Sequence, residues 1–119
     1  MRFMLLKMSS LTGPSDSDEE AQFVRSPLAA GVLLSADLLE PPSLGIRVER
    51  PTGMPQVHPR RPREMQREIV RYWVIDVKSL AEAVEWAKRC PCTETEAIEV
   101  RQILEPSAPR RLREPMARH

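Results

Sequence analysis

The sequence predicts an α+β fold in which two helices cover one face of an antiparallel β-sheet. Three observations lead to this prediction. The chain of 119 residues has the length of one domain. Several short segments alternate between apolar and polar side chains, as half-buried strands do. One of the strand-like segments runs directly into a capped amphipathic helix.

The first strand and the first helix are expected near the N-terminus. Residues 2–8 predict a strand whose middle is apolar on both faces, as in the centre of a sheet. A helix is expected from about 18 to 29, with Asp16 or Ser17 as its N-cap and acidic residues in its first turn. Pro27 predicts that this helix is short or irregular, because a proline removes a helical hydrogen bond.

Two further strands are predicted in the middle of the chain. Gly31 stops the first helix, and residues 32–39, "VLLSADLL", follow as a strand that Pro41 ends. Residues 44–50, "LGIRVER", alternate between aliphatic and charged side chains and predict the next strand. An irregular loop is expected over about 50–67, where prolines and arginines accumulate.

The C-terminal half of the chain carries the clearest signal. Residues 69–77, "IVRYWVIDV", are rich in β-branched and aromatic side chains and predict a strand. Ser79 and Glu82 form an S-x-x-E capping box where the apolar period changes. A helix is predicted to follow, and one of its faces is buried. That face consists of Leu80, Ala83, Val84 and Ala87, which recur at helical spacing, and Trp86 lies at its edge. Pro91 ends the helix, and residues 97–103 predict a last strand with one wet face.

The predicted order is strand, helix, strand, strand, strand, helix, strand, which is typical of a ferredoxin-like α+β fold. With both helices on one face, the other face of the sheet needs a cover. We therefore expect a homodimer in which two sheets stack face to face.

Charge and hydropathy argue against several classes of protein. The 18 Lys and Arg residues balance 17 Asp and Glu residues, so no global field attracts polyanions. Basic side chains concentrate in residues 58–71 and 106–119, and nucleic-acid binding through these segments ranks last among the functions considered. The apolar run before Lys7 is too short for a signal peptide, and no segment is long enough to span a membrane. We expect a cytoplasmic protein.

Cys90 and Cys92 form a C-x-C pair. A zinc site needs about four ligands in paired spacings, and His58 and His119 are the only histidines that remain as ligands. A disulfide across one intervening residue would be strained. We therefore predict no metal and no cofactor, and Cys90 is interpreted as a small apolar residue at a helix end.

Four polar residues on or beside the predicted strands are candidate site residues: Asp37, Ser43, Arg47 and Tyr72. They are expected to line the cleft between the sheet and the helices, where such side chains suit a small polar ligand. Asp37 would be the base of a catalytic site, and the other three would bind the ligand. These positions also fit ordinary surface or interface residues.

Arg60 and Arg61 are two further candidate ligand-binding residues. Their guanidinium groups would bind a small acidic ligand if the loop packs across the cleft. The loop has no interleaved aromatic side chains, which favours a solvated loop as the alternative interpretation.

Four stretches together resemble the YCII-related family and, within it, the DGPF-domain branch. They match in order and spacing over about half of the chain, and they read "MRFMLLKM", "AAGVLLSADLLEPPSLGIRVE", "YWVIDVKSLAEAVEWAKRCP" and "IEVRQILEP". The resemblance implies a dimeric α+β barrel. For a few relatives it also implies a small-molecule pocket with lyase or hydrolytic dehalogenase chemistry.

The chain departs from the family pattern at its signature. Pro62 stands where the proline of the DGPF motif would, but Arg60, Arg61 and Arg63 replace its Asp, Gly and Phe. Catalytic relatives outside the branch pair a His on the first helix with an Asp. Here the Asp position is Ala29 and the expected helix contains no His, so this proton-transfer pair is missing.

Two classes of function stay open for a YCII-like domain at residues 1–105 with an Arg- and Pro-containing tail at 106–119. The first, which these departures favour, is a non-catalytic homodimer that binds a small ligand or a protein partner. The second is a lyase or hydrolase that acts on a small acidic or carbonyl compound through Asp37. Fold-level resemblance alone does not decide between them.

Overall fold

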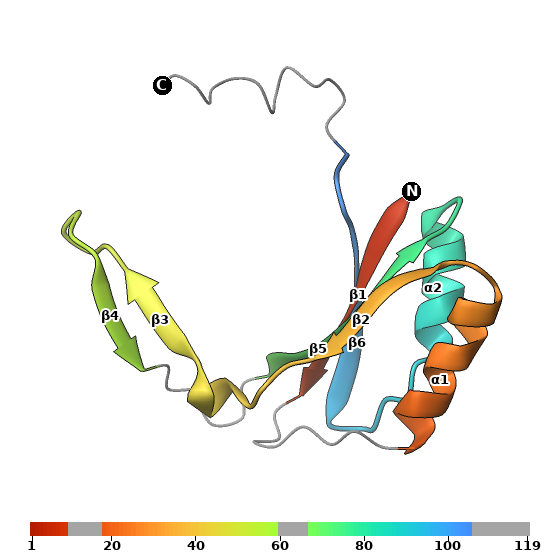
Figure 1. Ribbon diagram of the computed structural model, residues 1–119, viewed down its shortest axis with the longest axis horizontal. Coiled ribbons are helices and arrows are strands. Elements are labelled where there is room, and N and C mark those ends of the chain that lie inside the picture. Colours follow the sequence, from red (N-terminus) through yellow and green to blue (C-terminus); the bar gives the residue numbers. More distant parts are fainter. Residues whose placement is uncertain (10–17, 60–66, 106–119) are drawn as a thin grey trace.

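The computed structural model describes residues 1–9, 18–59 and 67–105. A four-stranded sheet lies between two helices on one side and a separate two-stranded hairpin that projects on the other side (Figure 1). The elements are β1 (Arg2–Ser9), α1 (Asp18–Ala29), β2 (Leu33–Leu38), the 3₁₀ turn η1 (Pro42–Leu44), β3 (Ile46–Glu49), β4 (Gln56–Pro59), β5 (Glu68–Asp76), α2 (Leu80–Arg89) and β6 (Glu96–Gln102).

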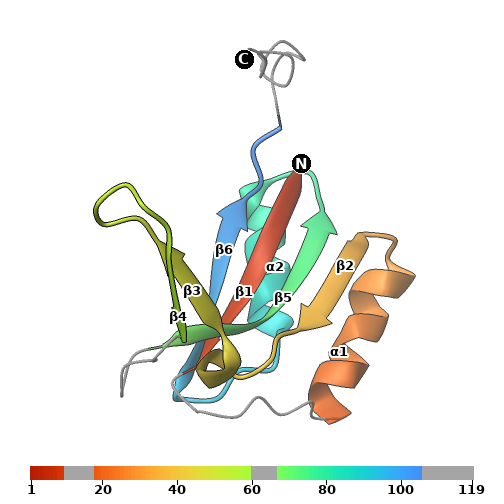
Figure 2. The same ribbon diagram turned by 60° about the vertical axis from the view of Figure 1, so that its left-hand side comes forward.

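The sheet has the strand order β2-β5-β1-β6, and every neighbouring pair is antiparallel. Each helix connects two strands that have a third strand between them: α1 joins β1 to β2, and α2 joins β5 to β6. Figure 2 shows the sheet with α2 behind its strands. The predicted α+β architecture is confirmed, and it is consistent with a ferredoxin-like fold.

The core lies between the sheet and the helices because alternate residues of the two central strands point toward the helices. Phe3 and Leu5 of β1 and Trp73 and Ile75 of β5 are buried there. Phe23 of α1 meets Trp73 edge to face, with ring centroids 5.4 Å apart and planes at 82°.

Helix α1 continues through Pro27, so the prediction of a short or irregular helix was wrong. The proline lies near the C-terminal end, where its missing N–H removes one hydrogen bond of the helix, and its ring is fully buried. Gly31 stops the helix as predicted, just beyond its last residue, Ala29. Gly31 has a φ of 75°, its N–H donates to the Leu28 carbonyl, and the Val32 N–H donates to the Pro27 carbonyl, which is a Schellman motif.

The middle of the chain differs most from the prediction. Residues 56–59, in the segment predicted to be an irregular loop over 50–67, form the strand β4, which pairs with β3. The predicted strand over 44–50 is shorter and belongs to this hairpin and not to the main sheet. Prolines at both ends of β4 obscured its alternation, and an edge strand tolerates them.

Helix α2 begins with the predicted capping residues. The Ser79 side chain accepts a hydrogen bond of 3.2 Å from the Glu82 N–H, and the Glu82 carboxylate accepts one from the Lys78 N–H. Ala83 is fully buried, but Leu80 is 56% exposed, so the prediction that Leu80 is part of the buried face was wrong. In the first turn of the helix, Leu80 lies beyond the edge of the core.

Within the described part of the chain, neither helix has the length and apolar character needed to cross a membrane.

The N-cap of α2 provides a test of the fold. We expect Ser79→Ala to lower the free energy of unfolding by about 1 kcal/mol, because the Glu82 N–H loses its acceptor. Urea denaturation at one fixed protein concentration measures the change. The control is Ser26→Ala in the exposed interior of α1, where the same substitution should be neutral or slightly stabilising. Equal effects of the two substitutions would rule out the capping interaction.

Candidate functional site

Two of the candidate site residues meet on neighbouring strands. Asp37 of β2 lies directly opposite Tyr72 of β5, and the Tyr72 hydroxyl donates a hydrogen bond of 2.6 Å to the Asp37 Oδ2. β2 is an edge strand of the sheet, so the pair is open to solvent on one side. A carboxylate held by a phenol keeps its second oxygen available to accept a hydrogen bond from a bound molecule.

The pair lies on the face of the sheet opposite the helices. Trp73, the next residue along β5, points into the core beneath α1, and side chains alternate along a strand. The prediction that Asp37 and Tyr72 line the cleft between the sheet and the helices was therefore wrong. The alternation from the buried Trp73 could have placed Tyr72 correctly.

The hydrogen bond to Asp37 raises the pKa of Tyr72 above its ordinary value. Loss of the phenolic proton would place two negative charges beside each other, and partial desolvation and the charge of Asp37 act in the same direction. Tyr72 therefore stays protonated at neutral pH and acts as a hydrogen-bond donor to Asp37.

The other candidate residues do not join this pair. Ser43 lies in η1 and is exposed. Arg47 lies in β3, directly opposite His58 of β4, in the separate hairpin. Arg60 and Arg61 lie outside the described residues. The described part of the candidate site is therefore an acid and a phenol without a basic side chain.

A second polar site, which was not predicted from the sequence, lies on the helix side of the sheet. The Lys7 ammonium of β1 donates a hydrogen bond of 2.6 Å to the Glu20 Oε2 of α1 and lies 3.3 Å from the Glu96 Oε1 of β6. The Arg71 Nε lies 3.5 Å from the same Glu20 oxygen. The side chains of Lys7, Arg71 and Glu20 are at most 9% exposed, so this is a buried ionic cluster.

The pairing changes the pKa of Lys7 and of Glu96 in the direction that favours their charged forms. Burial alone would lower the pKa of Lys7, but the hydrogen bond and the charge of Glu20, assisted by Glu96, raise it overall. Burial alone would raise the pKa of Glu96, yet hydrogen bonding from the Thr93 N–H and the charge of Lys7 lower it. A protonated Lys7 is not a nucleophile or a base. Its stabilising contribution is present at neutral pH and is lost as the pH rises through the raised pKa.

Arg71 links the ionic cluster to the aromatic core. Its guanidinium carbon lies 5.8 Å from the centre of the Trp73 ring, within the range of a cation–π contact. Ser9 and Glu68 are also buried, and they lie directly opposite each other on β1 and β5. A lysine inside an otherwise apolar strand was the one signal in the sequence for this cluster.

The two cysteines lie in different environments. Burial raises the pKa of Cys90 to about 12, and the nearby Cys92 adds to the shift, so Cys90 remains a thiol. Both cysteines are free, and Cys92 is exposed. No group of three His, Cys, Asp or Glu residues that could hold a metal occurs among the described residues.

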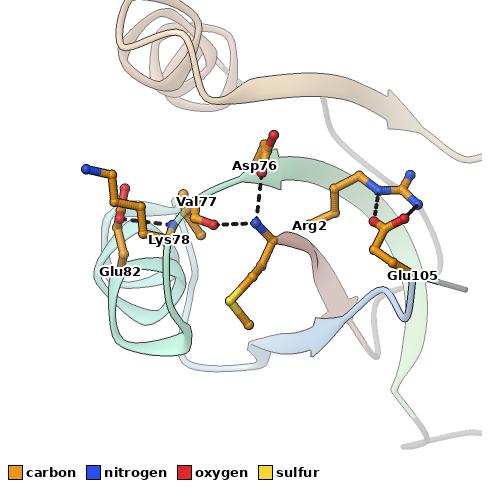
Figure 3. A network of polar contacts seen from close by, with 7 residues as sticks. Arg2, Asp76, Val77, Lys78, Glu82 and Glu105 are labelled. Carbon is orange, nitrogen blue, oxygen red and sulfur yellow. Dashed lines mark hydrogen bonds and ion pairs between the residues drawn. The ribbon is translucent and has the colours of Figure 1, made fainter. Parts of the chain in front are cut away.

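A third set of polar contacts joins the ends of three strands (Figure 3). The Met1 ammonium donates to the Asp76 carboxylate at 3.1 Å and to the Val77 carbonyl at 2.7 Å. The Arg2 guanidinium makes two hydrogen bonds to the Glu105 carboxylate. The two ion pairs are exposed, and together these contacts join the ends of β1, β5 and β6.

The model of the YCII-related domain matches residues 28–107. This range includes Asp37 and Tyr72, whereas Lys7 and Glu20 lie before it. No curated protein matches the chain.

The buried ionic cluster predicts a large effect of removing its lysine. We expect Lys7→Met to lower the free energy of unfolding by about 3–5 kcal/mol, because Glu20 and Glu96 lose the cation that they share and only Arg71 remains beside Glu20. Urea denaturation at fixed protein concentration is the measurement. Lys88→Met removes an exposed pair with Glu85 and should cost less than about 1 kcal/mol. The double variant Lys7→Met/Glu20→Gln should recover part of the loss, and failure to do so would contradict the pairing.

The Asp37–Tyr72 hydrogen bond can be tested by titration, because Tyr72 is the only tyrosine in the chain. Tyrosinate absorbance followed against pH reports its pKa directly. We expect Asp37→Asn to lower that pKa toward the ordinary value, since the negative charge beside the phenol is removed. Glu99 lies on β6 in the same row of the sheet, with Leu6 between it and Tyr72. Glu99→Gln should therefore leave the pKa of Tyr72 unchanged. An unchanged midpoint in Asp37→Asn would show that the hydrogen bond does not form in solution.

Proposed function

The chain belongs to the YCII-related domain family, and on this basis we propose that it is a non-catalytic homodimer that binds a small polar ligand at Asp37 and Tyr72. The single observation that carries the ligand site is the short hydrogen bond between these two side chains on the open face of the sheet. We also propose membership of the DGPF-domain branch, which rests on the order and spacing of the four matching stretches.

The dimer proposal is supported by the composition of the sheet face opposite the helices, which we call the open face, although Leu6 and Val74 at its centre are already buried in the single chain. Register places Ser35, Val74, Met4 and Arg101 in one row across the four strands, and Asp37, Tyr72, Leu6 and Glu99 in the next. The two central strands thus supply mostly apolar side chains, and the edge strands supply polar and charged ones. An apolar centre with a polar rim is the usual composition of a protein interface. A second copy stacked on this face would give a dimeric α+β barrel.

The ligand proposal follows from the groups at the edge of this face. Tyr72 already donates to one Asp37 oxygen, so a ligand meets a carboxylate with unused acceptor capacity. The matching ligand is a small molecule with N–H or O–H donors. An acidic ligand would depend on Arg60 and Arg61, which lie outside the described residues. In the proposed dimer, the second copy would cover this edge of the sheet and partly enclose the ligand.

Two observations favour binding over catalysis. Position 29 is alanine and α1 contains no histidine, so the His–Asp pair of catalytic relatives has no counterpart here. Tyr72 is held protonated by the same carboxylate that would have to serve as the base. A lyase or hydrolase reaction through Asp37 is the alternative, and turnover of a bound compound would establish it.

Chemical-shift perturbation of the ¹⁵N-labelled protein tests the ligand site. Ethanolamine, which carries N–H and O–H donors, should shift the amides of β2 and β5 around Asp37 and Tyr72. Malonate, a dicarboxylate of similar size, should shift them much less. Asp37→Asn should weaken ethanolamine binding at least about tenfold, because a charge-assisted hydrogen bond is lost.

Glu99→Gln is the matched control, since it removes an exposed carboxylate from the opposite edge of the same face. It should leave ethanolamine binding unchanged. The proposed ligand class is wrong if malonate binds more tightly than ethanolamine, or if Asp37→Asn and wild type bind ethanolamine equally.

A further inference from the structure

The β3–β4 hairpin has one apolar and one polar face. Directly opposite residues of paired strands share a face, and successive residues alternate. The pairs Ile46–Pro59 and Val48–Val57 lie on one face of the hairpin. The pairs Arg47–His58 and Glu49–Gln56 lie on the other face. His58 Nε2 and Glu49 Oε1 lie 2.6 Å apart across the polar face. The hairpin is therefore amphipathic, with an ordered polar face.

The apolar face of the hairpin is uncovered within the described residues. Ile46, Val48 and Val57 are 73%, 57% and 67% exposed, although β-branched residues in paired strands are usually half-buried. Exposed large apolar side chains concentrate in and around this region of the chain, and they include Leu38, Leu39, Leu44 and Met54. A two-stranded hairpin alone is marginally stable in water, so this face needs a partner.

The position of the hairpin indicates which partner covers it. The hairpin projects on the side of the sheet opposite the helices, which is the side that the open face presents (Figures 1 and 2). Its base is fixed by Pro41 and Pro42 and by a hydrogen bond of 2.9 Å from the Leu39 N–H to the Val70 carbonyl of β5. A molecule stacked on the open face would therefore lie beside a hairpin whose direction is already set.

We infer that the β3–β4 hairpin packs its apolar face against a second copy of this chain, each hairpin of the dimer extending alongside the sheet of the other subunit. This inference rests on the proposed homodimer. It adds the hairpin as a second contact surface, continuous with the open face of the sheet.

The dimensions of the hairpin agree with this arrangement. Each of its strands has four residues and spans about 13 Å at about 3.3 Å per residue. Stacked sheets lie about 10 Å apart. A hairpin that starts at the sheet of one subunit and extends toward the other subunit is thus long enough to reach the sheet of that second subunit.

The burial of the open face shows why the sheet alone is a poor interface. Leu6 and Val74 at its centre are only 7% and 8% exposed in the single chain, so stacking removes little further apolar surface there. A stable dimer buries about 800 Å² on each partner. The exposed apolar side chains of the hairpin supply surface that the centre of the sheet does not.

Two neighbouring substitutions on β4 test the hairpin contact. Val57→Lys places a charge on the apolar face, and Gln56→Lys places the same charge on the polar face. We expect Val57→Lys to raise the dimer dissociation constant at least about tenfold in sedimentation equilibrium, because the change occurs twice in a symmetric dimer. Gln56→Lys should change it less than about threefold, since that face is exposed to water. Equal dissociation constants for the two variants would overturn the inference.

A measurement on the unaltered protein guards against local unfolding of the hairpin in Val57→Lys. In a mixture of ¹³C-labelled and unlabelled protein, isotope-filtered NOEs arise only between subunits. The inference requires intersubunit NOEs from the methyl groups of Ile46, Val48 and Val57. The inference is overturned if a dimer forms and these methyl groups show no intersubunit NOEs. It is also overturned if a different protein is found to cover them.

A third variant separates this inference from the dimer proposal. Met4→Lys places a charge on the open face of the sheet, away from the hairpin. If wild type is a dimer that Met4→Lys dissociates and Val57→Lys does not, the sheet contact stands and the hairpin contact fails. If wild type is monomeric up to millimolar concentration, the homodimer and the hairpin contact both fail.

Discussion

The buried ion pair between Lys7 and Glu20 is the contact on which the position of the first helix depends. It joins the end of the central strand β1 to the first turn of α1. Removing two charges from water is costly, and only close geometry with further partners offsets that cost. Glu96 and Arg71 are those partners, so one cluster holds α1, β1, β5 and β6 in a fixed arrangement. Such a cluster favours one packing of helix on sheet over the alternatives that an apolar contact would tolerate.

The two faces of the sheet carry different polar arrangements. On the helix side, the charges are paired and buried, and Arg71 connects them to Trp73 and the aromatic core. On the other side, Asp37 and Tyr72 form a short hydrogen bond that remains open to solvent at the sheet edge. The first arrangement stabilises the fold, and the second leaves an acceptor available for binding. In this chain, a buried charged residue such as Lys7 is therefore weak evidence for a ligand-binding site. The exposed Asp37–Tyr72 pair at the sheet edge is stronger evidence.

Sequence reasoning succeeded where the signal was local. The Ser79 cap, the stop at Gly31 and the strand through Trp73 depend on a few neighbouring residues, and all three are present. It failed where the outcome depended on distant contacts. Lys7 and Glu20 meet only after the chain folds, and Pro27 is tolerated because its ring fills a buried position. The Asp37–Tyr72 pairing follows from the register of β2 against β5, which no local pattern specifies.

The register of β1 against β5 shifts between Lys7 and Met8: Lys7 lies opposite Arg71, but Met8 lies opposite Ile69, so Val70 has no opposite residue on β1. This is a β-bulge, and it returns Glu68 to the helix side opposite Ser9. The bulge thus keeps the alternation of inward and outward side chains on β5 in step with that on β1. The bulge therefore accommodates one extra residue in β5 while the side chains on both sides of it keep their faces, and the core around Trp73 is undisturbed.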